Sequence, residues 1–345
     1  SLMMFIVLTA VGVMRARSLL SAAGQKDRAE IRMAESERAS HEKTRIMTSM
    51  GEDLKGPMTE VSGMVEALRE TRLTAKQVEF IDIIEKSGGE ILSILDDIVD
   101  YTNLEMGELQ IRPNEFDLRT FIENIADQMG GEARAKRLDL VTHITAGAPD
   151  LVVADEERLK KVIVNLIDNA IKYTNEGSIL VAVESTPIDG KTASLKVAVK
   201  DTGMGISEER REMIFAPAAL PDGSDKRRYG VMGLGLSVSR GIIRANGGDI
   251  AVESTLGKGS EFSFDLHVPY KFQSTNKQSP FKAAKNLNQV QILIVDDTPV
   301  CANILEKKLN EIGMMPKIVA SAELACEALT TAYNAHKPFA FTLID

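Results

Sequence analysis

Three short sequence motifs bring together side chains that suit the binding of a nucleoside triphosphate. In the helical stretch NLIDNAIKYT, residues 165–174, Asn165, Asn169 and Lys172 stand at positions i, i+4 and i+7. A helix therefore presents two amides and a cation on one face. Amide oxygens and an ammonium group suit a magnesium–triphosphate, because Mg²⁺ takes oxygen ligands and retains several waters. The first motif predicts a helix that binds phosphate and metal.

The second and third motifs are rich in glycine. In DTGMGI, residues 201–206, Asp201 follows a strand-like run and can accept hydrogen bonds from an exocyclic amine, while the glycines let a flat ligand approach the backbone. In GLGL, residues 233–236, glycines precede a helix expected from about Ser237, whose free N–H groups can face phosphate. Each motif alone also occurs in ordinary turns. The order and spacing of all three together indicate a nucleotide site.

Composition argues against several other classes of function. The chain has 345 residues, with 41 Lys and Arg against 50 Asp and Glu, and its net charge of −9 argues against a nucleic-acid partner, which usually needs a basic face. Its four histidines have no metal-binding spacing, which argues against a zinc site. Its two cysteines, Cys301 and Cys326, are too few for a disulfide framework and fit a reducing cytoplasm.

The N-terminal part of the chain has the pattern of a membrane anchor followed by an exposed helix. Residues 2–14 carry no charge, and Arg15 and Arg17 follow at once, as is typical of the cytoplasmic side of a span. A full span needs about 20 apolar residues, so we expect residues 1–14 to be the end of a transmembrane helix. A signal-peptide core or a short buried helix are the alternatives. The charge-dense residues 15–45 predict a signalling helix or coiled coil on the cytoplasmic side of the inner (cell) membrane.

Residues 46–108 have the apolar spacing of two helices joined by a short turn. Residues 74–77 have the form of a capping box that opens the second helix, so we predict an antiparallel helical hairpin. A lone hairpin exposes its apolar stripe, and we expect two copies to bury it in a dimeric four-helix bundle; packing on the chain's own neighbouring domain is the alternative. The predicted stripe comprises Met47, Met50, Leu54, Met58, Val61, Val65, Leu68, Ile81, Ile84, Gly88, Ile91, Leu95 and Ile98.

From residue 109 to residue 270 the pattern alternates between helical and β-like stretches, which predicts an α/β domain. Residues 271–289 are polar and show no period, as in a linker. Residues 290–345 then alternate strand, helix, strand, helix and strand. Within residues 109–270, helices are expected at 118–129 and 156–174, and strands at 178–184, 194–200, 249–253 and 261–268.

Together these motifs resemble the ATP-binding domain of sensor histidine kinases, which is related to the gyrase and heat-shock chaperone ATPases. The resemblance covers residues 152–174, IFAP at 214–217 and STLGKGSEFSFDL at 254–266. It implies an α/β sandwich that binds ATP and Mg²⁺, with residues 216–232 as a lid. It also implies that Asn169 holds the magnesium and that Asp201 reads the adenine. The other implied ATP-binding residues are Asn165, Lys172, Tyr173, Gly203, Gly205, Ile206, Gly233, Gly235 and Leu236.

The first helix of the hairpin resembles the phosphoacceptor helix of that family, which carries Met-Ser-His-Glu-Leu-Arg-Thr-Pro-Leu. Here the matching stretch is MGEDLKGPM, residues 50–58, so that Glu52 stands at the histidine position and Asp53 at that of the neighbouring base. A neutral imidazole can attack the γ-phosphate. A carboxylate is repelled by the negative triphosphate and is a poorer nucleophile. Gly56 replaces a residue that helps the family's phosphatase reaction. We expect Glu52 to be a solvated helix residue rather than a mimic of the phosphorylated state.

The C-terminal segment resembles the start of a receiver domain, a doubly wound α/β fold. VQILIVDD resembles the first receiver strand, with Asp296 and Asp297 as the magnesium-binding pair, and FTLID places Asp345 at the phosphoacceptor position. An unrelated α/β strand that ends in Asp-Asp is the alternative. Residues 290–345 reach only the third strand, so we expect a partial receiver, cut at its end.

These features lead to one prediction and two alternatives. We expect a two-component signal transduction protein of the hybrid sensor histidine kinase family that binds Mg–ATP as a homodimer but is defective in autophosphorylation. Such a pseudokinase would regulate a partner histidine kinase or a response regulator. The alternatives are an active kinase with a non-standard acceptor that passes phosphate to receiver aspartates, and an interaction scaffold without nucleotide. The three nucleotide motifs favour the first prediction over the scaffold.

Overall fold

A computed structural model describes residues 46–47, 49, 51–145, 147–211, 213–216, 234–272 and 287–345. The chain divides into two compact units, one up to Leu109 and one from Gln110 onward. The predicted end of a transmembrane helix (1–14), the signalling helix (15–45), most of the lid and most of the linker lie outside the described residues. Within the described part, no helix is both long enough and apolar enough to cross a membrane.

The first unit is a helical hairpin, as the capping box and the apolar spacing predict. A helix over residues 51–69 is followed by a turn and by helix α2 (Ala75–Glu105). The Thr74 side chain accepts a hydrogen bond from the Gln77 N–H, and the Gln77 side chain accepts one from the Thr74 N–H at 2.8 Å. This reciprocal pair satisfies N–H groups that have no partner inside the helix, so the residues themselves fix where α2 begins.

The two helices of the hairpin run antiparallel and pack through small residues. A Cβ added to Gly51 would lie 2.9 Å from Val99 Cγ2, so the helices approach closely there. Lys55 and Asp96 form an ion pair of 2.7 Å between the helices. Such an exposed pair contributes about 0–1 kcal/mol, so packing holds the hairpin together.

Only part of the predicted apolar stripe is buried in the single chain. Val65, Ile81, Gly88 and Leu95 are buried, whereas several other stripe residues remain exposed because one hairpin has no second apolar layer. The four-helix dimer stays a prediction. The exposed large apolar side chains of the hairpin are Ile46, Leu54, Val61, Met64, Leu68, Val78, Phe80, Ile83, Ile84 and Ile91.

The second unit begins with a seven-stranded mixed sheet covered by helices. Its strand order is β1-β3-β7-β5-β4-β2, and β6 also pairs with β7. Only β2 and β4 pair in parallel. The elements are β1 (Asn114–Asp117), α3 (Leu118–Ala135), β2 (Leu138–Ile144), β3 (Leu151–Ala154), α4 (Glu156–Tyr173), β4 (Gly177–Pro187), β5 (Thr192–Asp201), α5 (Glu208–Arg211), the 3₁₀ turn η1 (Met213–Phe215), α7 (Leu234–Ala245), β6 (Ile250–Thr255) and β7 (Gly259–Lys271).

Strand β7 holds this sheet together, because it pairs along both edges. One edge pairs with β5 over residues 261–269. The other pairs with β6 over residues 259–264 and with β3 at residues 270–271. The thirteen residues of β7 therefore join three strands that are distant from one another in sequence.

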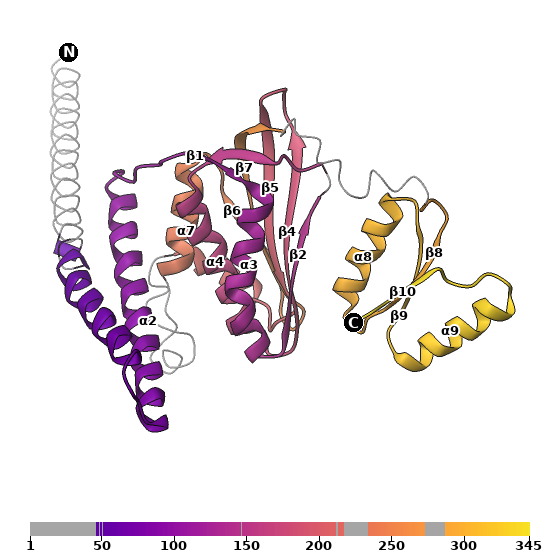
Figure 1. The fold of residues 1–345 in the computed structure, drawn as a ribbon. Helices are drawn as coiled ribbons and strands as arrows, with labels where there is room; N and C mark the ends of the chain where they lie inside the picture. Colours follow the sequence, from indigo (N-terminus) through magenta and orange to yellow (C-terminus); the bar gives the residue numbers. More distant parts are fainter. Residues whose placement is uncertain are drawn as a thin grey trace, which may run out of the picture. The chain divides into compact units, whose positions relative to one another are not determined.

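Helices α3, α4 and α7 lie against one face of the sheet and form the second layer of this domain (Figure 1). Their apolar residues recur at helical spacing, while those of β4 and β5 alternate, so both layers bury one side. The largest fully buried side chains of this core are Phe264, Leu118, Ile122, Ile125, Ile163, Leu166, Ile167, Ile179, Leu195, Ile242 and Ile243. The end of α4 lies beside the end of β5, where the Met204 N–H donates to the Tyr173 carbonyl at 3.3 Å.

Two features of this domain differ from the sequence prediction. The sequence prediction does not include strands β1, β2 and β3. Strands β1 and β3 have only four residues each, and they are held by pairing with strands distant in sequence rather than marked by a long local pattern. Helix α7 begins at Leu234 rather than at about Ser237. The predicted glycine turn before the helix is therefore its first helical turn, because Gly235 and Leu236 already have helical conformation.

The C-terminal segment folds as β8 (Gln291–Val295), α8 (Pro299–Glu311), β9 (Met315–Val319), α9 (Ala322–Asn334) and β10 (Phe341–Ile344). Its three strands are parallel, in the order β10-β8-β9. The five elements agree with the predicted alternation of strand and helix. Cys301 and Cys326 are free thiols, and burial, together with the nearby Asp296, raises the pKa of the Cys301 thiol to about 11.

Candidate functional site

Helix α4 carries the two asparagines of the first motif. Its N-cap is Asp155, which accepts the Arg158 N–H at 3.1 Å and the Arg112 N–H at 2.8 Å. This cap fixes the helix start. An apolar face with helical spacing from Leu159 to Ile171 is buried against the sheet. Asn165 and Asn169 are half-buried beside that face.

The two asparagine side chains form a short hydrogen-bonded network. Asn169 Nδ2 donates to the Asn165 main-chain oxygen at 2.8 Å and to Asn165 Oδ1 at 3.3 Å. Asn165 Nδ2 donates to the hydroxyl of Ser239 on α7 at 2.9 Å. The Asn169 side chain thus donates hydrogen bonds through its nitrogen to other described residues. Its amide oxygen is the atom suited to a divalent cation.

Helix α7 approaches α4 at Gly235, which explains the glycine of the third motif. A Cβ on residue 235 would lie 2.5 Å from Asn165 Oδ1. Any larger residue would therefore displace the asparagine. Gly235 belongs to the predicted phosphate turn, but what the structure shows for it is close packing of α7 on Asn165.

Asp201 lies at the end of β5 and is buried, with 6% of its surface exposed. One carboxylate oxygen accepts the Gly203 N–H at 2.8 Å, and the backbone N–H of Ser260 also donates to this carboxylate. Burial raises the pKa of Asp201, and the two backbone hydrogen bonds oppose that shift. These donors hold the carboxylate in place, as a side chain that reads a nucleobase amine requires.

The glycines of the second motif make room that larger residues would fill. A Cβ on Gly203 would lie 2.5 Å from the Tyr173 carbonyl and 2.8 Å from Asp201 Oδ1. Gly205 has φ +68°, a left-handed conformation that favours glycine, and a Cβ there would lie 2.1 Å from the Thr255 carbonyl. The turn 202–205 therefore folds closely over α4 and β6 and positions Asp201.

A buried hydroxyl beside Asp201 supports the fit of a polar ligand. Thr174 Oγ1 is buried and has no hydrogen-bond partner in the described part of the chain. The position of a Cβ on Gly203 would lie 2.9 Å from this hydroxyl and 2.8 Å from Asp201 Oδ1. A buried polar group without a partner costs about 1–3 kcal/mol. The carboxylate, the unpaired hydroxyl and the amides match the base, metal and phosphates of a nucleotide, so the residues present fit ATP with Mg²⁺.

The remaining predicted ATP-binding residues lie around this arrangement, with one exception. Lys172 is exposed near the end of α4, and its Nζ lies 5.3 Å from the centre of the Tyr173 ring. The Ile206 N–H donates to Ser254 Oγ at 2.7 Å, which ties the end of the DTG turn to β6. Leu236 is half-buried on α7. Gly233 lies outside the described residues.

Phe215 and helix α7 are joined by an arginine cluster that the sequence reasoning missed. The Arg240 guanidinium lies 4.7 Å from the centre of the Phe215 ring. Arg240 and Arg244 each donate two hydrogen bonds to Asp249, with distances from 2.7 to 3.1 Å. The pKa of Asp249 lies far below its usual range, mainly because Arg240 donates hydrogen bonds to its carboxylate. The cluster fixes the orientation of α7, the helix that contacts Asn165.

Glu52 and Asp53 lie on the first helix of the hairpin, and both are exposed. Gly51, next to them, is buried against α2. A side chain at position 52 therefore reaches solvent, as an acceptor of a phosphoryl group would need. Nothing in the geometry gives the Glu52 carboxylate a neighbouring base among the described contacts.

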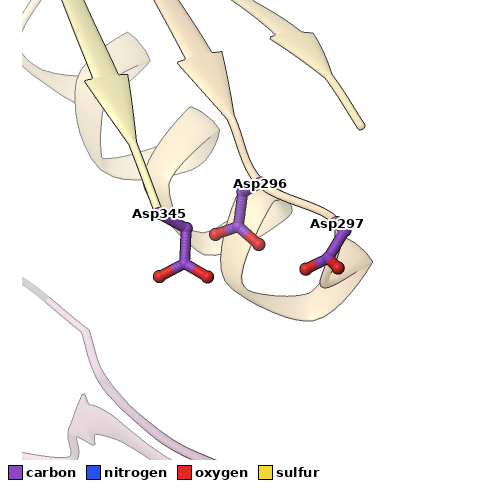
Figure 2. A group of neighbouring side chains, drawn as sticks. All are labelled: Asp296, Asp297 and Asp345. Atoms are coloured by element: carbon purple, nitrogen blue, oxygen red, sulfur yellow. The ribbon is translucent and has the colours of Figure 1, made fainter. Parts of the chain in front are cut away.

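Three aspartates converge at one end of the C-terminal sheet. Figure 2 shows the side chains of Asp296, Asp297 and Asp345 at this end of the sheet. Each can offer a carboxylate oxygen such that all three oxygens lie within 4.8 Å of one another. The parallel register that pairs Ile344 with Val295 brings Asp345 beside Asp296. The Thr298 N–H donates to Asp296 Oδ1 at 2.8 Å. Three carboxylates suit a hard cation such as Mg²⁺, which prefers oxygen ligands.

Two domain families match the chain. Residues 42–107 match the His Kinase A (phospho-acceptor) domain. Residues 154–270 match the histidine kinase-, DNA gyrase B- and HSP90-like ATPase family. The prediction of a helical hairpin followed by an α/β ATPase domain of the histidine kinase type is therefore confirmed.

Curated relatives match this chain over part of their own, longer sequences. The sensor protein GacS of Pseudomonas syringae pv. syringae is 29% identical over 86% of this chain and 32% of its own length. The histidine-protein kinase BarA of Escherichia coli K12 is 32% identical over 67% of this chain and 25% of its own length. The Dictyostelium discoideum protein dokA is 35% identical over 67% of this chain and 14% of its own length. The chain thus spans a third or less of each of these relatives.

A solved structure shares the fold. The crystal structure of full-length ShkA in complex with AMPPNP superposes with a TM-score of 0.64 over 87% of this chain and 68% of that protein. Its sequence identity to this chain is 21%. The likeness extends over both the hairpin and the ATPase-like domain, and it concerns the fold alone.

Proposed function

Since this chain belongs to the sensor histidine kinase family of two-component signalling proteins, we propose that it binds Mg–ATP but does not phosphorylate itself at the usual helix position. The observation that carries this proposal is a contrast between two sites. Asn169, Asp201 and the close-packed glycines retain the chemistry of a nucleotide site. On the hairpin helix, Glu52 stands where the resemblance to the family places the imidazole nucleophile.

The proposed chemistry follows from the side chains of the chain itself. Asp201 accepts a hydrogen bond from the adenine amine, and its two backbone donors keep the carboxylate in position. Asn169 offers its amide oxygen to the Mg²⁺ that accompanies the triphosphate, and Lys172 adds a positive charge near the phosphates. A bound Mg²⁺ would neutralise part of the charge on the phosphates. The negative charge that remains on the phosphates would repel the Glu52 carboxylate. A carboxylate is also a poorer nucleophile than a neutral imidazole.

The proposed role is that of a dimeric regulator. Exposed apolar side chains on both helices of the hairpin would be covered by a second hairpin in a four-helix bundle. Nucleotide binding would change the state of the domain attached to that dimer and so bias a partner histidine kinase or response regulator. The regulatory partner is thereby a protein of the same signalling class. Anchoring of the parent protein at the membrane remains part of this proposal.

Two measurements on the wild-type chain test the proposal. Calorimetric titration with AMPPNP and Mg²⁺ is expected to show saturable binding, and incubation with γ-labelled ATP is expected to leave the chain unlabelled. No binding at millimolar nucleotide would favour the nucleotide-free scaffold instead. Label on the wild-type chain would favour a kinase with a non-standard acceptor, and its stability to acid and base would identify the acceptor class.

We further propose that Asp296, Asp297 and Asp345 bind Mg²⁺ in the partial receiver. Asp345→Asn removes one of three convergent carboxylates, so the affinity of the nucleotide-free chain for Mn²⁺, used as a paramagnetic substitute, should fall by about tenfold. Glu323→Gln on α9 is the matched control, because that exposed carboxylate lies outside the cluster. Equal Mn²⁺ affinity for Asp345→Asn and the wild type would contradict this metal site.

A further inference from the structure

Ser239 is a polar residue on the apolar face of α7. Only 2% of its surface is exposed, and its helix neighbours Val238 and Ile242 are 1% and 0% exposed. A hydroxyl at such a position costs free energy unless it is hydrogen-bonded. Among the residues that the structure describes, its partner outside its own helix is the Asn165 side-chain amide at 2.9 Å. Packing alone therefore does not account for a serine at this position.

The contact determines which way the Asn165 amide faces. An asparagine side chain has an NH₂ donor on one side and an oxygen acceptor on the other. With Nδ2 on Ser239, Asn165 Oδ1 faces Asn169 Nδ2 at 3.3 Å. The reversed orientation would place two NH₂ groups against each other, so the orientation with a donor toward Ser239 is the one that satisfies both asparagines.

Gly235 and Ser239 enclose Asn165 from the same helix. They are four residues apart on α7, so they share one face. Gly235 allows the close approach of Asn165 Oδ1, and Ser239 holds its nitrogen. Asn165 is thus held at its nitrogen by Ser239, and Gly235 leaves room for its oxygen. Asn169 Nδ2 donates both to that oxygen and to the Asn165 main-chain oxygen.

We propose that Ser239 is a positioning residue for the metal–nucleotide site, acting through Asn165 to keep the Asn169 amide oxygen available to the cation. The contact chain runs from the Ser239 hydroxyl to the Asn165 amide and from there to Asn169 Nδ2. The inference rests on the proposed Mg–ATP binding. It adds that the contact between Asn169 and the cation depends on the Ser239 hydroxyl, although this hydroxyl does not itself touch nucleotide or metal.

The test compares nucleotide affinity with and without metal. For Ser239→Ala, the affinity for AMPPNP in the presence of Mg²⁺ should fall by about tenfold, as is typical when a partner that orients a metal ligand is removed. The affinity for AMPPNP in EDTA should stay within about twofold of wild type, because the adenine and turn contacts do not involve Ser239. A purely structural role would weaken binding in both conditions.

Two further variants separate positioning from packing. Ser237→Ala removes another hydroxyl from the same helix, one that donates to the Leu234 carbonyl at 2.7 Å, and should bind as wild type does. Ser239→Thr retains the hydroxyl and should retain the effect of Mg²⁺. In an Asn165→Ala background, Ser239→Ala should add no further loss, because the partner through which it acts is gone.

The outcomes distinguish this inference from the function on which it rests. If the wild-type chain fails to bind AMPPNP with Mg²⁺, the proposed function fails. If the wild-type chain binds and Ser239→Ala retains the full Mg²⁺ effect, or loses affinity equally in EDTA, Ser239 is not a positioning residue. A loss confined to the Mg²⁺ condition, absent in Ser237→Ala and in Ser239→Thr, supports the inference.

Discussion

Asp201→Asn is expected to lower the affinity of the chain for AMPPNP with Mg²⁺ by about 100-fold, a loss of about 3 kcal/mol. The wild-type carboxylate accepts N–H groups from Gly203 and Ser260. An asparagine in its place would turn an NH₂ group toward one of these donors or toward the adenine amine. One contact is then lost, and the buried donor that remains has no acceptor.

The pH dependence of binding supplies a second readout for the same residue. Burial raises the pKa of Asp201 above the ordinary 3.8. Only the ionised carboxylate accepts from both backbone donors and the adenine amine, so affinity should fall as the pH is lowered from 7 through that raised pKa. Asp201→Asn should lack this pH dependence. Calorimetry of both proteins across this range measures the difference.

The folded domain should survive the substitution of Asp201. A raised carboxyl pKa in the fold means that the ionised form is less favourable there than in the unfolded chain, so the ionised Asp201 lowers stability at neutral pH. Relief of that penalty offsets part of the cost of the unpaired backbone donor, so the loss of binding in Asp201→Asn should be much larger than any fall in the free energy of unfolding. Asp265→Asn, an exposed carboxylate on β7, is the matched control and should bind as wild type does. Unchanged affinity in Asp201→Asn would refute its assigned role.

The second large effect is expected at the hairpin helix. Glu52→His combined with Asp53→Glu should incorporate γ-phosphate label at a rate at least about 100-fold above wild type, because a positioned nucleophile and base contribute on that order. Position 52 is exposed, so an imidazole there is accessible to a nucleotide domain. A phosphohistidine is labile to acid and stable to base, and this property distinguishes the new label from a phosphate ester.

Controls assign that label to the intended histidine. Glu60→His introduces an imidazole at another exposed glutamate of the same helix and should not be labelled. Adding Asp201→Asn to the double variant should remove most of the labelling at a nucleotide concentration near the Kd of the double variant, since nucleotide affinity falls by about 100-fold. Label on the wild-type chain would contradict the proposed defect. An unlabelled double variant that still binds AMPPNP would show that Glu52 is not what prevents the reaction.

Much of the fold follows from local sequence patterns. The capping box at residues 74–77 and the apolar spacing around Ile81 and Leu95 predict α2 because the relevant contacts lie within a few residues. Strand β8 is predictable in the same way, since residues 292–295 (ILIV) are a continuous apolar run. In contrast, β1 and β3 have four residues each. They pair with each other across the whole of α3 and β2, and β3 also pairs with the distant strand β7. Local patterns carry little of that information.

The candidate site was predictable at the level of residue types but not of contacts. The spacing of Asn165 and Asn169 and the sequence DTG indicate a nucleotide site, and the geometry of these residues fits one. The sequence pattern does not mark Ser239 as functional, because a serine on an apolar helix face is indistinguishable from a tolerated small residue. Its partner Asn165 is 74 positions away. A signal was nevertheless present, since Ser239 stands four residues after Gly235 and shares its face.

Strand β7 has a consequence for the synthesis of the protein. It is the last strand of its sheet in chain order, yet β3, β5 and β6 all depend on it for pairing. Until β7 has been translated, those strands have no partner along the edges that β7 will occupy. The nucleotide domain can therefore complete its sheet only once residue 271 has left the exit tunnel, and until then its unpaired edges are exposed to chaperones and to neighbouring nascent chains.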